Sequence, residues 1–168
     1  MKKLLFIAFP LILFSCGQES NKPMTEDQKE KVKEEINPVI TQLFECLYQA
    51  DFEKYLSFWD STEFTYIMNG QPADFKVFRD TNKQFWSGLE YQKINRLSEK
   101  LIIINQESVI YTIIGNDEAK FRNGDILKVD PYAASFLLKK VDGLWKIQHA
   151  HGSGQFSTNP QDLLAPAK

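Results

Sequence analysis

The chain has two histidines, His149 and His151, and they lie two positions apart near the C-terminus. If this segment is a β-strand, alternate side chains share a face, and the two imidazoles lie about 7 Å apart. Trp145, Ile147 and Ser153 belong to the same set, and its two apolar members are expected to face the protein interior. Imidazole titrates near neutral pH and can give or take a proton. The spacing therefore predicts His149 and His151 as a catalytic pair facing a cavity, with a structural hydrogen-bonding role as the alternative.

A second set of residues is suited to holding a small molecule. Aromatic rings offer apolar surface, and the hydroxyl of a buried tyrosine can orient a ligand. The predicted ligand-binding residues are Trp59, Asp60, Tyr66, Trp86, Tyr91, Tyr132 and Ser153. The alternatives are a place in the core or on a dimer face for the aromatic residues, and capping of backbone N–H groups for Asp60.

Metal and cofactor chemistry are not predicted. The sequence has no glycine-rich phosphate loop and no cysteine cluster, and a metal site would need a third ligand beside the two histidines. Asp60, Asp117 and Glu118 qualify as that ligand only by residue type. Cys46 is the single cysteine besides Cys16, and its helical spacing from apolar residues indicates a buried thiol. The site is therefore expected to work without a metal or a cofactor.

The N-terminal segment has the pattern of an export signal. Lys2 and Lys3 precede an apolar run over residues 4–14, which is about half as long as a membrane-spanning helix. Residues 13–16, which end in Cys16, resemble the lipobox of bacterial lipoproteins. In that family the signal is cut before the cysteine, which then carries lipid. An ordinary secretory signal is the alternative.

The lipobox resemblance implies a location and a division of the chain. Residues 1–15 form the signal peptide, and residues 16–26 form the lipidated Cys16 and a flexible tether. A membrane of the bacterial cell envelope is then a partner of the chain, and the periplasmic side of the outer membrane is the preferred location. A folded domain follows over residues 27–156, and residues 157–168 form a tail.

Composition restricts the function of the mature chain. Loss of Lys2 and Lys3 with the signal leaves 18 basic and 22 acidic residues, a net charge of −4. Nucleic-acid binding is not expected, because phosphate contacts need a concentrated basic face. Roughly 150 mature residues are enough for one domain with a substantial core. The 13 Phe residues indicate either a large core or an aromatic-lined cavity.

Three helices are predicted in the first half of the domain. Thr25 and Gln28 have the spacing of a capping box before a long helix, whose apolar stripe ends near Tyr48. Pro38 is expected to kink this helix or to divide it. Asp51 ends the stripe before a second, short amphipathic helix, and Asp74 can cap a third.

The second half of the domain is predicted to be mostly β-strand. Asn69-Gly70 and Asp142-Gly143 are turn signals. The predicted strands cover residues 63–68, 101–104, 109–114, 133–141 and 144–153. Helices followed by a run of strands indicate an α+β domain with the helices on one face of the sheet.

The chain resembles the nuclear transport factor 2-like superfamily, and within it the SnoaL-like bacterial proteins, over about Ile36 to Phe156. The resemblance rests on four features in order. They are the helix end Tyr48-Gln49-Ala50-Asp51-Phe52, the step Phe58-Trp59-Asp60 before a strand, a third helix before long strands, and the closing hairpin of residues 142–153, in which Trp-Lys-Ile runs on to a histidine and a serine.

This resemblance implies an α+β cone, in which three N-terminal helices pack in the concave face of a strongly curved, mostly antiparallel sheet, as in the cystatin-like fold. The open end of the cone is usually a pocket. The superfamily includes isomerases, dehydratases, cyclases, binding modules and dimerisation domains, so the fold does not determine the chemistry. The ketosteroid isomerase pattern is not met. Its tyrosine position holds Leu43, and residues 65–68 contain no carboxylate.

Three functions follow from these expectations. The first is an envelope lipoprotein whose cone binds a small, largely apolar molecule without catalysis. The second is a cofactor-independent SnoaL-like lyase or isomerase that uses His149 or His151. The third is a structural role as a homodimer through the outer sheet face, with apolar surface from Ile102, Ile104, Ile110 and Ile114.

Overall fold

The structure, a computed structural model, describes residues 23–158. Its three helices are α1 (Glu26–Gln49), α2 (Phe52–Ser57) and α3 (Phe75–Ser87). Its strands are β1 (Thr65–Met68), β2 (Gln71–Ala73), β3 (Leu89–Asn105), β4 (Ser108–Phe121), β5 (Ile126–Val141) and β6 (Leu144–Phe156). The predicted signal peptide and the lipidation site at Cys16 lie outside the described residues. Within residues 23–158, no helix has the length and apolar character needed to cross a membrane.

Local sequence signals explain where the helices begin. Thr25 and Gln28 form the predicted capping box at the start of α1. The carboxylates of Asp51 and Asp74 accept hydrogen bonds from backbone N–H groups in the first turns of α2 and α3. Pro38 lies inside α1, which continues through it as one helix and is therefore not divided there.

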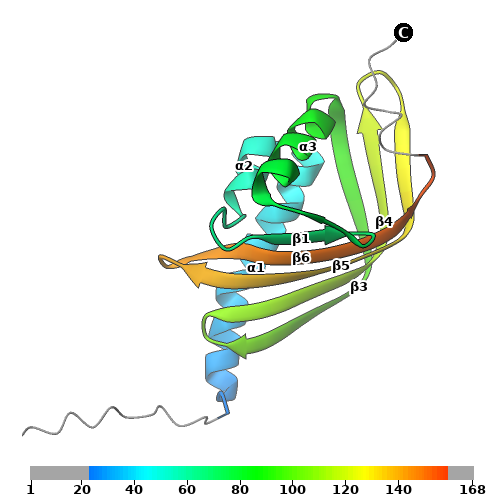
Figure 1. The fold of residues 1–168 in the computed structure, drawn as a ribbon. Coiled ribbons are helices and arrows are strands. Elements are labelled where there is room, and N and C mark those ends of the chain that lie inside the picture. The colour runs from blue at the N-terminus through cyan, green and yellow to red at the C-terminus, as the bar shows by residue number, and fades with distance from the viewer. Residues whose placement is uncertain (1–22, 159–168) are drawn as a thin grey trace, which may run out of the picture.

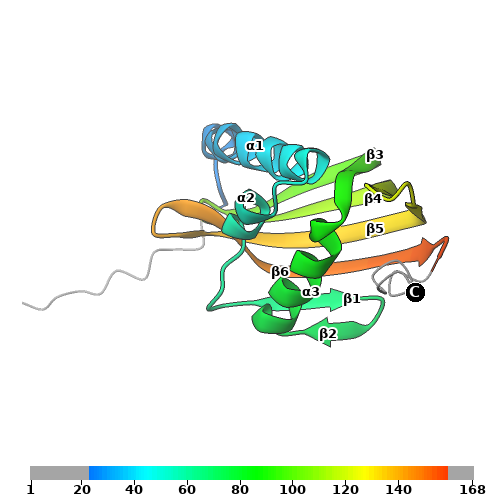
Figure 2. The same cartoon turned by 90° about the horizontal axis from the view of Figure 1, so that it is seen from above.

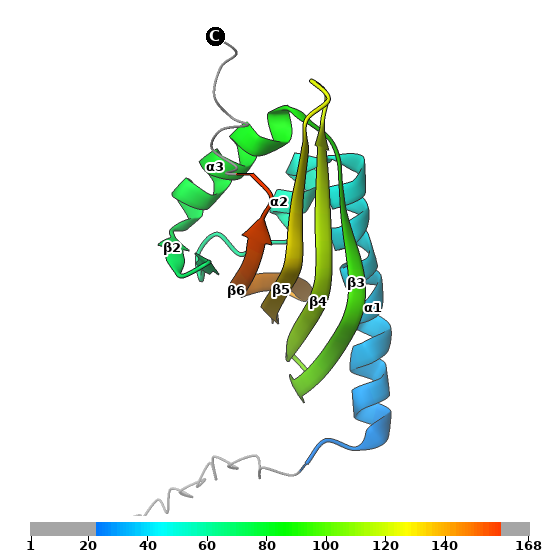
Figure 3. The same cartoon turned by 90° about the vertical axis from the view of Figure 1, so that its right-hand side faces the viewer.

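The strands form one curved six-stranded sheet in the order β2-β1-β6-β5-β4-β3 (Figure 1). The β1–β6 pair is parallel and the other pairs are antiparallel. The helices lie on the concave side, with α1 along β3 and α3 beside β1 and β2 (Figure 2). Figure 3 shows β3, β4 and β5 bending around this side. The expected α+β cone is confirmed.

The core fills the space between α1 and the inner face of the sheet. Ile36 and Leu43 of α1 are buried there against residues of β4, β5 and β6 such as Val109, Leu138 and Ile147. Inward-facing residues of β4 alternate with outward-facing ones along the whole strand. The strands β3 and β4 extend well beyond the predicted segments. Most of the added residues of β3 are polar and lack the β-branched pattern that marked the predicted segments, but they pair with β4 through the backbone.

The pairing register of the sheet shifts at several places, and two of these β-bulges, in β6 and at the start of β3, concern predicted site residues. In β6, Ile147 pairs with Leu138 and His149 pairs with Leu137, so Gln148 is an extra residue. In β3, Leu89 pairs with Phe121 and Tyr91 with Lys120, so Glu90 is extra. Each bulge moves the residues that follow it to the opposite face of the sheet from that predicted by simple alternation.

Asp60 holds the bulge of β6 in place. Its carboxylate accepts hydrogen bonds from the backbone N–H of Thr62 at 2.9 Å, the Thr62 hydroxyl at 2.7 Å and the Gln148 amide at 2.9 Å. The Thr62 hydroxyl is the largest of the influences that lower the pKa of Asp60 to about 2. Backbone bonds between Asp60 and Ile147 and between Ile147 and Phe58 complete the connection.

We expect Asp60→Ala to lower the free energy of unfolding by about 3 kcal/mol, because it leaves several donors around a buried position without their acceptor. Asp51→Ala, which removes only the cap of the exposed N-terminus of α2, should cost about 1 kcal/mol. Urea denaturation of both variants measures the difference. Equal losses would show that Asp60 is no more than an ordinary cap.

Candidate functional site: an aromatic cavity with one buried carboxylate

The concave side of the sheet and the helices enclose a cavity of about 630 Å³. All three helices and all six strands contribute to its wall. Ten aromatic side chains line it, namely Phe44, Tyr55, Trp59, Tyr66, Phe78, Phe85, Trp86, Tyr132, Phe136 and Phe156. The structure thus places four of the predicted ligand-binding residues, Trp59, Tyr66, Trp86 and Tyr132, in one cavity wall. Pockets of this size and character are typical of small-molecule sites.

The two histidines do not line this cavity, so the expectation that they share a face with Trp145 and Ile147 is wrong. The latter two are buried on the inner face as predicted, but the bulge at Gln148 shifts the rest of β6. Ala150 and Gly152 are buried there instead. His149, His151 and Ser153 alternate with them and therefore lie on the outer face of the sheet.

Two other predicted ligand-binding residues also lie outside the cavity lining. The bulge at Glu90 places Tyr91 on the outer face, where its hydroxyl donates to Glu118 at 2.9 Å. Asp60 is buried, but its carboxylate binds Thr62 and the β6 bulge, as the capping alternative anticipated. Both residues support the walls of the cone.

Asp117 of β4 is the functional candidate that the sequence suggested only as a metal ligand by residue type, and not as part of a ligand-binding site. It lines the cavity and is 7 % exposed. Its Oδ2 accepts a hydrogen bond from the Gln92 amide at 2.6 Å, whereas its buried Oδ1 has no partner among the described residues. Burial raises the pKa of this carboxyl from 3.8 to about 6. An available signal was the alternation of β4, in which residue 117 continues the inward series of Val109, Tyr111 and Ile113.

Three tyrosines bring hydroxyl groups to the same cavity from different elements, Tyr55 from α2, Tyr66 from β1 and Tyr132 from β5. Burial raises the pKa of all three, to about 12 for Tyr66. The Asp117 charge contributes to the rise in pKa at Tyr55 and Tyr132. These hydroxyls therefore remain protonated at physiological pH and can both donate and accept hydrogen bonds.

Asp117 is the one ionised side chain expected at neutral pH among the described residues of the cavity wall, which contain no Lys, Arg or His. Within residues 23–158 there is also no group of three or more His, Cys, Asp or Glu residues arranged to hold a metal ion. The arrangement can bind an apolar molecule, accept a hydrogen bond or a proton at Asp117, and donate from tyrosine hydroxyls.

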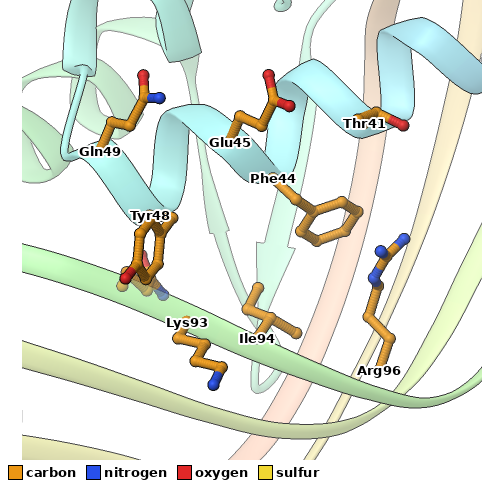
Figure 4. Close-up of a pocket in the computed structure, with 9 residues that line it drawn as sticks. Thr41, Phe44, Glu45, Tyr48, Gln49, Lys93, Ile94 and Arg96 are labelled. Atoms are coloured by element: carbon orange, nitrogen blue, oxygen red, sulfur yellow. The ribbon is translucent and has the colours of Figure 1, made fainter.

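A shallower groove of about 290 Å³ lies between α1 and β3, outside the cavity (Figure 4). The Arg96 guanidinium covers the Phe44 ring at 4.5 Å from its centroid. Phe44, Gln92 and Ile94 line both spaces and form the partition between them. The charged residues of this region, Glu45, Lys93 and Arg96, line the groove and not the cavity.

Asp117 should make the free energy of unfolding fall as the pH rises from 4 to 7, which is the direction opposite to that of an ion-paired carboxylate. Because its folded-state pKa lies above its ordinary value, its contribution to stability is complete below pH 3.8 and is lost as the pH rises through 6. Between pH 4 and pH 7, the free energy of unfolding of the wild type should fall by about 2–3 kcal/mol relative to Asp117→Asn. Urea denaturation across this range tests the prediction, and a constant difference between the two proteins would contradict it.

Solved structures with the same fold come from proteins of low sequence identity. A proposed scytalone dehydratase from Novosphingobium aromaticivorans superposes with a TM-score of 0.66 at 9% identity, over 78% of this chain and 89% of that one. A proposed dehydratase of the nuclear transport factor 2-like family from Streptomyces avermitilis gives 0.63 at 14% identity, over 75% and 97%. A hexachlorocyclohexane dehydrochlorinase gives 0.62 at 11% identity, over 79% and 92%. At such identities the likeness establishes the fold alone.

Sequence comparison gives the family. A comparison with curated proteins finds no match to this sequence. The model of the SnoaL-like domain matches residues 36–157, which is more than half of the chain and includes most of α1 and the whole sheet. The protein therefore belongs to the SnoaL-like domain family.

Proposed function

We propose that the cone binds one small, largely apolar molecule that carries a polar group. The observation that carries this proposal is the cavity of about 630 Å³, whose wall combines ten aromatic side chains with the buried carboxylate of Asp117, one oxygen of which has no partner among the described residues. The aromatic wall favours an apolar body, and the orphan carboxylate oxygen favours a hydrogen-bond donor at one end.

The energy available from the wall is sufficient for useful affinity. Burial of about 250 Å² of apolar ligand surface is worth about 6 kcal/mol. A polar contact at a buried carboxylate adds to this, and the loss of translational and rotational freedom subtracts from it. With about 2–3 kcal/mol from the polar contact and a cost of about 4 kcal/mol, a dissociation constant of about 0.2–1 mM is the expected balance.

The uncharged fluorophore N-phenyl-1-naphthylamine should bind the wild-type domain at one site with enhanced emission. Ala134→Leu adds bulk to the cavity wall and should weaken this binding at least tenfold. Ala133→Leu changes the neighbouring residue, which points to the outer face, and serves as the matched control. Circular dichroism verifies that both variants fold. Equal binding by both would place the fluorophore outside the cavity and contradict the proposal.

A second candidate function is proton transfer by Asp117, as in a cofactor-independent lyase or isomerase. A pKa of about 6 suits a general base near neutral pH, and the tyrosine hydroxyls can stabilise negative charge on a carbonyl oxygen. In this reaction the proton of the carbon next to the carbonyl moves to Asp117, and the bonding electron pair moves toward the carbonyl oxygen. The expected enzymatic role thus moves from His149 or His151 to the inner face of β4.

Exchange of the α-hydrogens of 4-phenylbutan-2-one in deuterated water, followed by NMR, tests this candidate. The wild type should accelerate exchange, and the Asp117→Asn variant should be about 10²–10⁴-fold slower than the wild type. Glu118→Gln removes the adjacent carboxylate from the outer face and should keep the rate. No acceleration by the wild type, or an undiminished rate in Asp117→Asn, would exclude Asp117 as the base for this ketone.

The homodimer through the outer sheet face and the lipid anchor at Cys16 stay predictions from the sequence. Ile102, Ile104 and Ile114 are exposed apolar residues in the described part of the chain. Sedimentation velocity tests the dimer, which a monomer at micromolar concentration would contradict. Palmitate labelling that survives Cys16→Ser would contradict the anchor.

A further inference from the structure

We infer that the ligand of this cavity is a protonated amine on an apolar body, with its ammonium group at the Asp117 carboxylate and its body among the aromatic rings. This inference rests on the proposed binding function and specifies the chemical class of the ligand. It comes from three properties of the cavity: its charge, its unmet hydrogen-bonding capacity and its aromatic wall.

The charge of the wall has one sign. Among the described lining residues, Asp117 supplies the single carboxylate, and there is no Lys, Arg or His to balance it. The cations Lys93 and Arg96 lie in the outer groove. Gln92 donates to Oδ2 but carries no charge. An anionic ligand would be repelled by Asp117 and would meet no cation among the described lining residues, whereas a cation would compensate a charge whose burial is costly.

The hydrogen-bonding capacity also suits an ammonium group. Oδ1 of Asp117 is buried without a donor. Tyr55 and Tyr132 bring hydroxyl groups to the same wall. An ammonium group has three N–H donors and no acceptor, so it can donate to the carboxylate and to hydroxyl oxygens of this wall. A neutral alcohol offers one donor and leaves the carboxylate charge uncompensated.

The aromatic wall favours a cation for a separate reason. The ring faces of Trp, Tyr and Phe carry partial negative charge and attract ammonium groups within about 6 Å. Tyr55, Trp59 and Trp86 are packed together, with ring centroids 5.8 Å apart for Tyr55–Trp59 and 4.7 Å apart for Tyr55–Trp86. All three line the cavity. Aromatic groups thus surround the space that the apolar body and the head of the ligand would share.

Three probes of matched shape test the inference, namely 4-phenylbutylamine, 4-phenylbutan-1-ol and 4-phenylbutanoate. Calorimetric titration of the full domain at pH 7.5 should show the amine binding at least tenfold more tightly than the alcohol, and the carboxylate binding at least tenfold more weakly than the alcohol. In Asp117→Asn, which keeps the shape of the side chain, the preference for the amine should fall below threefold. Glu118→Gln, on the outer face, should retain the wild-type preference.

A pH series adds a readout independent of the variants. From pH 7.5 to pH 5, protonation of Asp117 should weaken amine binding about tenfold and leave alcohol binding unchanged. The other titratable groups of the described wall are Tyr55, Tyr66 and Tyr132, which stay protonated, and Glu118 beside Asp117 faces outward. The helices α1 and α3 and the strands β2, β3 and β6 bring no titratable side chain to the wall.

The outcomes separate the inference from the function on which it rests. Equal affinity for amine and alcohol, or an amine preference that persists in Asp117→Asn, overturns the inference and leaves the binding function intact. Binding of N-phenyl-1-naphthylamine without binding of any of the three probes also overturns the inference. If neither the probes nor this fluorophore binds, the binding function itself is wrong.

Discussion

The structure depends on the need to bend long antiparallel strands around α1. A sheet with strands of 13 to 17 residues cannot bury one face against a single helix unless it curves. The bulges at Glu90 and Gln148 contribute to this curvature, and each one changes which residues face inward. The segment around Asp60 fastens the bulge of β6 to the end of α2. The pairing of these strands, with its bulges, therefore sets the curvature of the sheet, the choice of inward-facing residues and the shape of the cavity.

The cavity exists because the helices fill only part of the concave side. The core between α1 and the sheet is apolar, whereas the space beside α3 is lined by rings and by one carboxylate. A buried carboxylate with an unpartnered oxygen reduces stability, and Gln92 compensates for only part of that cost. A residue that reduces the stability of the fold in this way is typical of a functional site, because an apolar side chain at the same position would make the protein more stable.

Membership of the SnoaL-like family and the fold leave the chemistry open. The structural neighbours include proposed dehydratases and a dehydrochlorinase, at identities of 9% to 14%. What distinguishes this chain is the content of its cavity. It has no histidine among the described lining residues, and its polar groups are the Asp117 carboxylate, three tyrosine hydroxyls, the indole N–H groups of Trp59 and Trp86, a threonine hydroxyl and a few amides. Any binding of a polar group or proton transfer in the cavity therefore depends on residues such as Asp117 on the inner face of β4, because the histidines of β6 lie on the outer face.

The sequence by itself determined the elements that depend on local interactions. The caps at Thr25, Asp51 and Asp74 and the turns at Asn69-Gly70 and Asp142-Gly143 involve residues within a few positions of each other, and all are present in the structure. The same local reading placed Trp145 and Ile147 inward, because no bulge separates them. Trp59, Tyr66, Trp86 and Tyr132, which the sequence suggested as ligand-binding residues, lie in the cavity wall, because large aromatic side chains are usually buried in a core or a cavity.

Only the tertiary structure decided which face each later strand residue occupies. A bulge depends on how two distant strands pair, so the period of two in the sequence could not reveal that His149, His151 and Tyr91 lie outside. The pKa of Asp117 likewise depends on tertiary structure, because burial raises it and a hydrogen bond from Gln92, 25 residues away in the sequence, lowers it. The sequence predicted a cone and aromatic residues of its lining, whereas long-range strand pairing and burial placed one carboxylate, Asp117, in the cavity wall and raised its pKa.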